Sequence, residues 1–450
     1  MEGLQVRNRS EKLYTARRAS LILLTILFSP ATMLLEMRSI PRLLVLTAIV
    51  AGMGQCLLAA PAKRLSTTTH AKPATTTLMY MVNRPAAVQS FREHANQISI
   101  IAPQCFRMDA QGFVAGEVSP EILEIAREHK VALMPLVTNR GFKQDLMHTV
   151  LDTPESRARV IRYLLYYALR DGYIGFQFDY ENIKYYYRDR FTTFFHEAAT
   201  EFHRHGLLLS AAVVGKYADD RNSISPGGFD DWSGVYDYKA LGKDADFLSI
   251  MAYAEHAGYS DPGPIAGLPW VKQIVDFTVA NMPPRKVSLG VPTYGTRWIA
   301  VAPGTQVKAD FVQDNTGPKV KKWRVTSAAW PHAIPELLKT NKPVWDETEQ
   351  AHHFAFTDEH GVNNEVWYED ASSLKPKIDL ARQSKLGWGI SAWVLGTEDP
   401  EFWTMVAQNY TIKHPKTPVL KGTYEQRTKM AAKRLRVNTA AILHKATSAK

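Results

Sequence analysis

Eight short runs of apolar and β-branched residues recur along most of this chain, and helix-like segments separate most of them. Apolar runs of this length are typical of strands that are buried on both faces, as in a parallel sheet. Eight such strands alternating with helices predict an α/β fold, the (β/α)8 or TIM barrel. The predicted strands are 77–82, 97–102, 131–137, 175–180, 207–214, 246–252, 286–291 and 389–394, and the clearest helices are 120–129, 156–169, 189–205 and 269–280.

One interval between predicted strands, 298–386, is too long for a plain crossover helix. It contains strand-like text of its own at 353–357 and 365–369. We therefore predict a small α+β insertion after strand seven of the barrel. The barrel domain then occupies 78–410, and the Thr-rich segment 65–77 is a linker.

The N-terminal region contains an apolar run, 43–60, with the layout of a secretory signal. The run follows Arg38 and Arg42 and ends in the small residues of 60–62. A basic flank, an apolar run and a small-x-small exit are the marks of such a signal. The signal begins naturally at Met37, which leaves the true start codon open.

Residues 1–64 are accordingly an N-terminal extension with a signal or an anchor. Cleavage would leave a mature N-terminus near Lys63, whereas an uncleaved run of this length can just span a bilayer. Either way, the expected location is outside the cell or in the cell envelope.

The net charge of +10 comes from the two ends of the chain. Residues 413–450 carry ten Lys and Arg against one acid, and 1–64 carry nine against three, so the remaining body is mildly acidic. A mildly acidic body is not typical of a phosphate-binding surface, and we expect no nucleic acid partner. We expect 411–450 to be a solvated basic tail, and envelope association through this tail or the N-terminal segment. The two cysteines give neither a disulfide framework nor a metal cluster.

The strand predicted at 175–180 carries the chemistry, because catalytic side chains of such barrels project from the C-terminal ends of strands. With a period of two, Gln177, Asp179 and Glu181 point into the barrel mouth, and the aromatic residues between them point outward. Burying two carboxyl groups and an amide for structure alone is costly. The alternative is an inward polar layer that holds water.

The sequence IGFQFDYE at 174–181 resembles the strand-four signature of family 18 glycoside hydrolases, D-G-x-D-x-D-x-E, whose final Glu is the catalytic acid. Asp179 and Glu181 match its last two acids. Ile174 and Gln177 replace two earlier acids of the pattern.

Further motifs extend this resemblance over 77–403. They are LSIMAY at 248–253, GPIAGLPW at 263–270, GVPTYG at 290–295 and GISAWVLG at 389–396. VWYED at 366–370 and EDP at 398–400 are similar to a bacterial branch that includes spore-cortex and cell-wall N-acetylglucosaminidases.

The resemblance implies substrate-assisted hydrolysis, in which the 2-acetamido group of the sugar is the nucleophile and the configuration is retained. Glu181 would protonate the leaving oxygen and then deprotonate water. Asp179 would accept a hydrogen bond from the acetamide N–H, and Tyr253 would donate one to the acetamide carbonyl.

The resemblance also implies a sugar-contacting set. Trp393 would stack under the sugar at the −1 position. Ala254 stands where the branch usually has Asp, so an aglycone-side contact is either missing or replaced by Glu255. The candidate substrate-binding residues are Gln177, Met251, Glu255, Tyr294 and Trp393.

These implications predict a monomeric glycosidase that needs no metal or organic cofactor. Its partner would be a β-1,4-linked N-acetylglucosamine (GlcNAc) polymer, either chitin or peptidoglycan. The alternative is a catalytically weak or inactive, lectin-like barrel, which the loss of an acid at Gln177 keeps open.

Overall fold

The computed structural model of this protein describes residues 72–224, 226–301 and 322–437. The predicted N-terminal extension and signal or anchor, and residues 65–71 of the predicted linker, lie outside the described residues. Within the described ranges, no helix combines the length and apolar character that a bilayer crossing requires.

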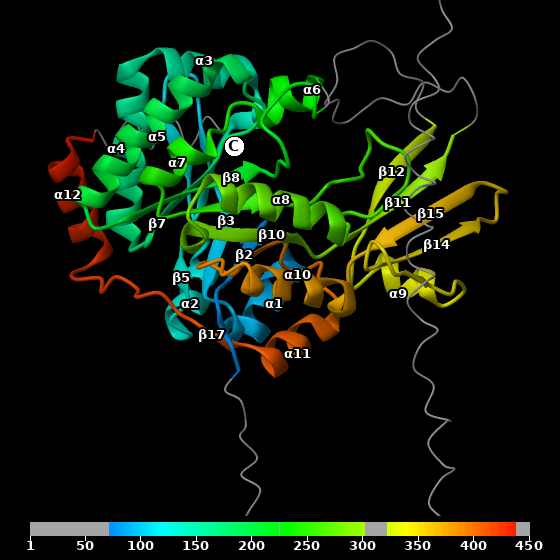
Figure 1. Ribbon diagram of the computed structural model, residues 1–450. Helices are drawn as coiled ribbons and strands as arrows, with labels where there is room; N and C mark the ends of the chain where they lie inside the picture. Colours follow the sequence, from blue (N-terminus) through cyan, green and yellow to red (C-terminus); the bar gives the residue numbers. More distant parts are fainter. Residues whose placement is uncertain (1–71, 225, 302–321, 438–450) are drawn as a thin grey trace, which may run out of the picture. The chain divides into compact units, whose positions relative to one another are not determined.

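Eight parallel strands form a closed barrel in the order β2–β16–β10–β9–β8–β7–β6–β3, and β3 pairs again with β2 (Figure 1). Each strand overlaps one of the eight predicted runs, so the predicted barrel is confirmed. The strands are β2 (Thr77–Met81), β3 (Ile100–Met108), β6 (Leu136–Asn139), β7 (Gly175–Asp179), β8 (Leu208–Val214), β9 (Phe247–Met251), β10 (Val287–Pro292) and β16 (Ile390–Trp393). Two short strands, β4 (Val114–Gly116) and β5 (Ala132–Leu133), pair with β3.

Helices connect the strands and cover the outside of the barrel (Figure 1). Many begin with proline in the first turn, where its missing N–H costs no hydrogen bond, and α2 also has the Ser119 side chain as its N-cap. The four helices predicted from sequence are confirmed as α2, α4, α5 and α8. The helices are α1 (Pro85–His94), α2 (Pro120–Glu128), α3 (Gln144–Asp152), α4 (Pro154–Asp171), α5 (Arg188–Arg204), α7 (Tyr238–Asp244), α8 (Leu268–Asn281), α10 (Ala371–Gln383) and α11 (Pro400–Asn409).

One layer inside the barrel is polar. The Gln177 side-chain amide donates to Ser210 Oγ at 2.8 Å and to Ser249 Oγ at 3.0 Å. Ser391 Oγ lies 2.8 Å from Ser249 Oγ and 2.6 Å from Ser288 Oγ. All five residues are buried, and hydroxyl groups suit such a layer because each can both donate and accept.

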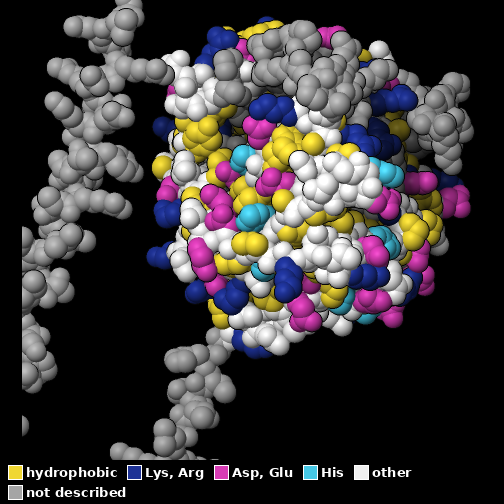
Figure 2. All heavy atoms as spheres, turned by 90° about the vertical axis from the view of Figure 1, so that its right-hand side faces the viewer, with side chains coloured by type: hydrophobic (Ala, Val, Ile, Leu, Met, Phe, Trp, Pro, Cys, Tyr) yellow, Lys and Arg dark blue, Asp and Glu magenta, His cyan; other side chains and the backbone are white. Residues whose placement is uncertain are grey.

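The chain segment between β10 and β16 forms a separate antiparallel sheet of five strands, in the order β12–β11–β15–β14–β13. Figure 2 views the molecule from this side, where basic and acidic side chains are interspersed over the described surface. The strands predicted at 353–357 and 365–369 are confirmed as β14 and β15. The inserted elements are β11 (Gly295–Ala300), β12 (Trp323–Ala328), α9 (Ala333–Leu338), β13 (Val344–Asp346), β14 (Ala351–Thr357) and β15 (Asn363–Tyr368).

Helix α10 falls within the range 298–386 assigned to the insertion from sequence, but it belongs to the barrel. Its buried residues Leu374, Ile378 and Ala381 are part of the main barrel core. The inserted sheet therefore ends at β15, and α10 is the crossover helix that leads to β16.

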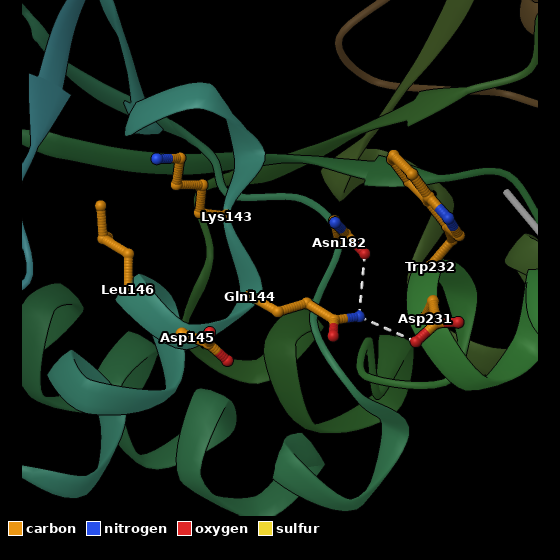
Figure 3. A pocket seen from close by; sticks show the side chains of 7 residues that line it. All are labelled: Lys143, Gln144, Asp145, Leu146, Asn182, Asp231 and Trp232. Atoms are coloured by element: carbon orange, nitrogen blue, oxygen red, sulfur yellow. Dashed lines mark hydrogen bonds between the residues drawn. The ribbon is translucent and has the colours of Figure 1, made fainter. Parts of the chain in front are cut away.

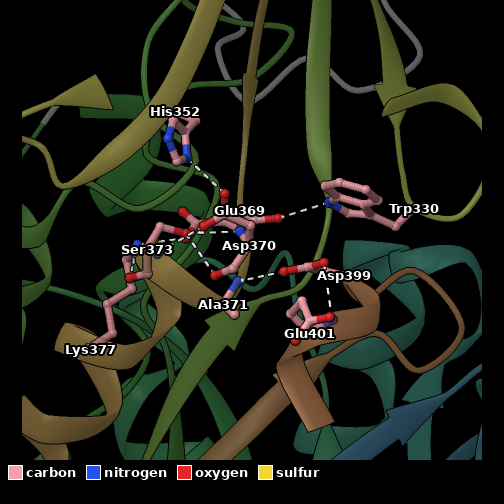
Figure 4. A network of polar contacts seen from close by, with 9 residues as sticks. All are labelled: Trp330, His352, Glu369, Asp370, Ala371, Ser373, Lys377, Asp399 and Glu401. Carbon is pink, nitrogen blue, oxygen red and sulfur yellow. Dashed lines mark hydrogen bonds and ion pairs between the residues drawn. The ribbon is translucent and has the colours of Figure 1, made fainter. Parts of the chain in front are cut away.

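A buried polar network joins the inserted sheet to α10 (Figure 4). Lys377 Nζ and Ser373 Oγ each donate to Glu369 Oε2 at 2.6 Å, and the Lys377 and Glu369 side chains are fully buried. The Asp370 side chain caps α10 by accepting from the Ser373 N–H at 3.0 Å, and it pairs with His352 Nδ1 at 2.7 Å. The insertion is thus fastened to the barrel by charge-assisted hydrogen bonds.

The two ends of the barrel domain meet in a short parallel pairing of β1 (Ala74–Thr75) with β17 (Thr411–Ile412). The predicted linker, 65–77, therefore ends earlier than expected from sequence, because β1 and the first residue of β2 lie within it.

The predicted basic tail, 411–450, is not wholly solvated, which corrects the sequence-based expectation. Helix α12 (Tyr424–Leu435) packs on α4, burying Ala431 and Leu435. Arg427 Nε donates to the Arg170 carbonyl oxygen at 2.7 Å, at the C-terminal end of α4. The small apolar face of α12 is hard to recognise in a sequence this rich in Lys and Arg.

Candidate active site

Strand β7 brings two carboxyl groups to the C-terminal mouth of the barrel. Asp179 is its last residue, and Glu181 follows two residues later. The outward aromatic rings anchor this segment: the ring centroid of Phe194 on α5 lies 5.3 Å from that of Phe178 and 6.1 Å from that of Tyr180. Because successive side chains alternate along an extended chain, this anchoring directs Asp179 and Glu181 inward.

The two carboxyl groups share one electrostatic environment. Asp179 is buried, and its Oδ2 accepts from Gln104 Nε2 at 3.0 Å. Burial raises the pKa of Asp179 to about 6, although hydrogen bonds from Gln104 and Glu181 oppose the rise. Burial and the negative charge of Asp179 raise the pKa of Glu181 well above its usual value. The neutral form of Glu181 is therefore favoured, and this is the state that a proton donor requires.

Asn139, the last residue of β6, holds the main chain of Glu181 from the neighbouring strand. Its Oδ1 accepts from the Glu181 N–H at 3.0 Å, and its Nδ2 donates to the Glu181 carbonyl oxygen at 2.9 Å. Asn139 is fully buried. The sequence analysis missed both Asn139 and Gln104. The signal for both was available in the sequence, because Gln104 and Asn139 are polar residues that come two positions after the predicted apolar runs 97–102 and 131–137.

A pocket of about 360 Å³ opens at Asn182, the residue after Glu181, between the loops that follow β6, β7 and β8 (Figure 3). Gln144 Nε2 bridges its walls by donating to Asn182 Oδ1 at 2.9 Å and to Asp231 Oδ1 at 2.8 Å. Lys184 forms an ion pair with Asp231. The lining residues are Lys143, Gln144, Asp145, Leu146, Asn182, Asp231 and Trp232.

Tyr253 and Tyr294 are half-buried at another part of the mouth, just after the ends of β9 and β10. Both pack against one apolar cluster that includes Ile265 and Trp298. Burial raises the pKa of Tyr253 well above its usual value, and nearby Tyr80, Asp179 and Tyr294 add to the rise. Tyr253 is thus a neutral hydrogen-bond donor that shares the electrostatic environment of Asp179.

Trp393 and Met251 complete the group of candidates that end barrel strands. Trp393 is the last residue of β16, and its ring centroid lies 5.7 Å from that of Tyr80 on β2. Met251 is the last residue of β9. Both side chains are half-buried. They therefore stand at the same end of the barrel as Asp179.

Two candidate substrate-binding residues, Gln177 and Glu255, make hydrogen bonds within the protein. Gln177 is fully buried in the polar layer beneath Asp179, so its amide supports the barrel interior and does not reach the mouth. Glu255 is half-buried, and its Oε2 accepts from the Gly267 N–H at 2.7 Å, at the start of α8. One carboxylate oxygen of Glu255 is therefore already engaged with the protein.

Comparison with known proteins agrees with this geometry. Residues 89–398 match the family model of glycosyl hydrolases family 18. The chain belongs to this family. The chain is 26% identical over 343 residues to an uncharacterized glycosylase of Bacillus subtilis, covering 75% of this chain and 92% of that protein. It is 26% identical over 332 residues to the cortical fragment-lytic enzyme of B. subtilis, covering 72% of this chain and 70% of that one.

Solved structures of family 18 relatives share the barrel. The Bacillus cereus spore cortex-lytic enzyme SleL superposes with a TM-score of 0.64 at 25% identity, covering 76% of each chain. A chitinase from Chromobacterium violaceum gives a TM-score of 0.64 at 25% identity, covering 75% of this chain and 99% of the chitinase. The resemblance seen in the sequence motifs, including the spore-cortex branch, is confirmed, and the chain is a family 18 glycosidase.

Proposed function

We propose that this glycosidase hydrolyses β-1,4-linked GlcNAc polymers by substrate-assisted, retaining catalysis. The observation that carries the proposal is the Asp179–Glu181 pair at the end of β7, where burial and the charge of Asp179 raise the pKa of Glu181 well above its usual value. One proton donor is enough when the acetamide of the sugar attacks the anomeric carbon and forms an oxazolinium ion.

In this mechanism the neutral Glu181 carboxyl gives its proton to the leaving oxygen, and the resulting carboxylate later accepts a proton from water. Asp179 accepts from the acetamide N–H and stabilises the charge that develops there. The Tyr253 hydroxyl donates to the acetamide carbonyl. Trp393 provides the apolar surface on which the reacting sugar stacks, and Tyr294 contributes at the rim.

The pocket at Asn182 suits the leaving-group side of the substrate. The residues that line it come from the loops after β6, β7 and β8, whereas Trp393 ends β16, which stands across the barrel from β7. The pocket and Trp393 therefore lie on opposite sides of Glu181. Its Gln144 and Asn182 amides and its Trp232 ring are groups that bind sugar hydroxyls and sugar faces. A chain that crosses the mouth would place the bond to be cut at Glu181.

The proposed test replaces Glu181 with Gln, which preserves the shape of the side chain but removes the acidic carboxyl proton. Hydrolysis should fall by the ~10²–10⁴-fold typical of general acid catalysis, while saccharide binding is retained. Glu124→Gln, on the exposed side of α2, is the matched control. Parent-like turnover in Glu181→Gln would refute the assignment.

Relatives named for cortical fragments and for chitin both match this chain, so the polymer is either peptidoglycan or chitin. Digesting both polymers with the purified protein, and identifying the reducing ends released, decides between them. Binding to either polymer without release of reducing ends would favour the lectin-like alternative. That alternative draws less support from Gln177 than the sequence suggested, because this side chain lies in the inner polar layer.

We propose further that the protein is exported to the cell envelope or secreted as a monomer that binds no nucleic acid. The support is the signal-like segment that begins at Met37 and the position of the positive charge at the chain ends. Either end of the chain would attach it to anionic envelope components. Determining the N-terminus of the exported protein tests this; a full-length chain with Met1 intact in the cytoplasm would contradict it.

A further inference from the structure

Glu255 follows Ala254, the position where this chain departs from the family pattern, and its side chain is bound to the start of α8. It stands two residues after Tyr253, in the loop that joins β9 to α8. Its Oε2 accepts from the Gly267 N–H at 2.7 Å, and its own N–H donates to the Ile265 carbonyl oxygen at 3.0 Å. Between Tyr253 and Glu255, Ala254 adopts a left-handed backbone with φ of 61°, which is unfavourable for a residue with a Cβ. The conformation of this loop is therefore held by the hydrogen bonds of Glu255.

Glu349 reaches the same point from the inserted sheet. It lies in the turn between β13 and β14, and its carbonyl oxygen accepts from the Leu268 N–H at 3.0 Å. A Cβ on Gly267 would overlap Glu349 Oε2 and would lie 3.0 Å from Glu255 Oε2. The two carboxyl groups thus converge on one glycine, and the close approach is possible because this residue has no side chain.

Both carboxyl groups lie close to Gly267 with little compensating charge around them. Burial, together with the nearby Glu349, raises the pKa of Glu255 to about 7, although the Gly267 N–H opposes the rise. Burial and Asp346 raise the pKa of Glu349. The other groups that face the pair are His256 and Tyr259 from the same loop, Glu369 at the end of the inserted sheet and Lys377 of α10. Lys377 is already paired with Glu369, so it compensates only part of the charge.

A raised pKa means that the neutral form of Glu255 is favoured in this environment. The stabilisation that the pair provides is fully present below the usual pKa of a glutamic acid. It disappears as the pH rises through about 7, where Glu255 ionises and its charge is repelled by that of Glu349.

The convergence point is connected to the reaction centre through tyrosines. The Tyr259 hydroxyl donates to the Ala254 carbonyl oxygen. Tyr253 and Tyr294 pack against an apolar cluster that includes Trp367 of the inserted sheet. The wall of the mouth that carries Tyr253 is therefore built jointly by the barrel loop and by the insertion.

We propose that Glu255 and Glu349 form a pH-dependent latch between the strand-six loop and the inserted sheet, which positions Tyr253 for catalysis. The latch is closed when the pair holds a proton and loosens when both carboxyl groups are charged. Glu255 and Glu349 are positioning residues that act through Tyr253. The effect of this latch on activity rests on the proposed function, whereas its effect on the structure of the loop does not.

The first experiment compares pH profiles of kcat/KM for the parent chain, Glu255→Gln and Glu349→Gln on a GlcNAc aryl glycoside. Glutamine mimics the protonated acid, so each variant should lose the component of the alkaline decline that has its midpoint near pH 7. The alkaline limb of the kcat/KM profile should therefore move by about one pH unit toward higher pH. Glu255→Ala should lower kcat/KM at every pH, and Glu255→Gln should restore it at low pH. Glu347→Gln, an exposed residue two positions before Glu349, is the control and should match the parent.

The second experiment follows hydrogen–deuterium exchange of the Gly267 and Leu268 amides between about pH 6 and 8, corrected for intrinsic exchange. Protection should fall through about pH 7 in the parent and persist in Glu255→Gln. Equal pH dependence of protection in the parent and Glu255→Gln would overturn the latch, as would superimposable activity profiles. If no glycan is hydrolysed by the parent, the proposed function fails, and the exchange measurement still decides the latch.

Discussion

Replacing Asn139 with alanine removes both hydrogen bonds that hold the peptide groups around Glu181. The Glu181 N–H and carbonyl lose partners at 3.0 Å and 2.9 Å, at a site where Asn139 is fully buried. A buried polar group without a partner costs about 1–3 kcal/mol, so the free energy of unfolding should fall by ~2–6 kcal/mol. Because Glu181 must reach the leaving oxygen, a displacement of about 1 Å should lower kcat/KM by ~10²-fold.

The assay is kcat/KM on a GlcNAc aryl glycoside, measured below the unfolding transition of each variant. Asn139→Asp is the informative second variant: it can still accept from the Glu181 N–H but cannot donate to the carbonyl. Its added negative charge should raise the pKa of Glu181 further. Asn409→Ala, which removes a side-chain hydrogen bond to Met405 at the end of α11, is the control and should keep parent activity. If Asn139→Ala is destabilised but retains parent kcat/KM, the idea that Asn139 positions the proton donor is wrong.

Three other changes test separate parts of the molecule. Asp179→Ala should lose most activity on GlcNAc glycosides together with the preference over glucose analogues, as measured by the rate ratio of the two aryl glycosides; an unchanged ratio would mean that another residue orients the acetamide. Lys377→Met leaves Glu369 buried without its partner and should cost about 3–5 kcal/mol in denaturant unfolding, and adding Glu369→Leu should recover much of it; equal stabilities of single and double variants would contradict this. Ending the chain after Lys421 removes α12 and should lower the free energy of unfolding by ~2–4 kcal/mol through exposure of the apolar surface that α12 covers. Turnover of a small substrate should persist, since α12 binds the C-terminal end of α4, opposite the mouth; a large loss would show that α12 supports the site.

The barrel and its principal carboxyl groups could be predicted from the sequence because their signals are local. A strand that is buried on both faces must be apolar throughout, and eight such runs are visible without knowledge of their partners. The alternation around Asp179 and Glu181 follows from the geometry of a single extended strand. The match of these two residues to the family signature then led to the mechanism.

The depth of each side chain along the barrel axis could be known only from the tertiary structure. Gln177 shares the inward direction of Asp179 but lies one layer deeper, among hydroxyl groups from four other strands. Its environment depends on the register between strands, which is a property of the closed barrel and of no single segment.

The supports of the site were also decided by the tertiary structure, because they join residues that are distant in sequence. Asn139 meets Glu181 across 42 positions, and Gln104 meets Asp179 across 75. Glu255 and Glu349 meet because an inserted sheet folds back onto the start of α8. Local periodicity determines which faces are buried, whereas such pairs form only when closure of the barrel brings distant strand ends to one mouth.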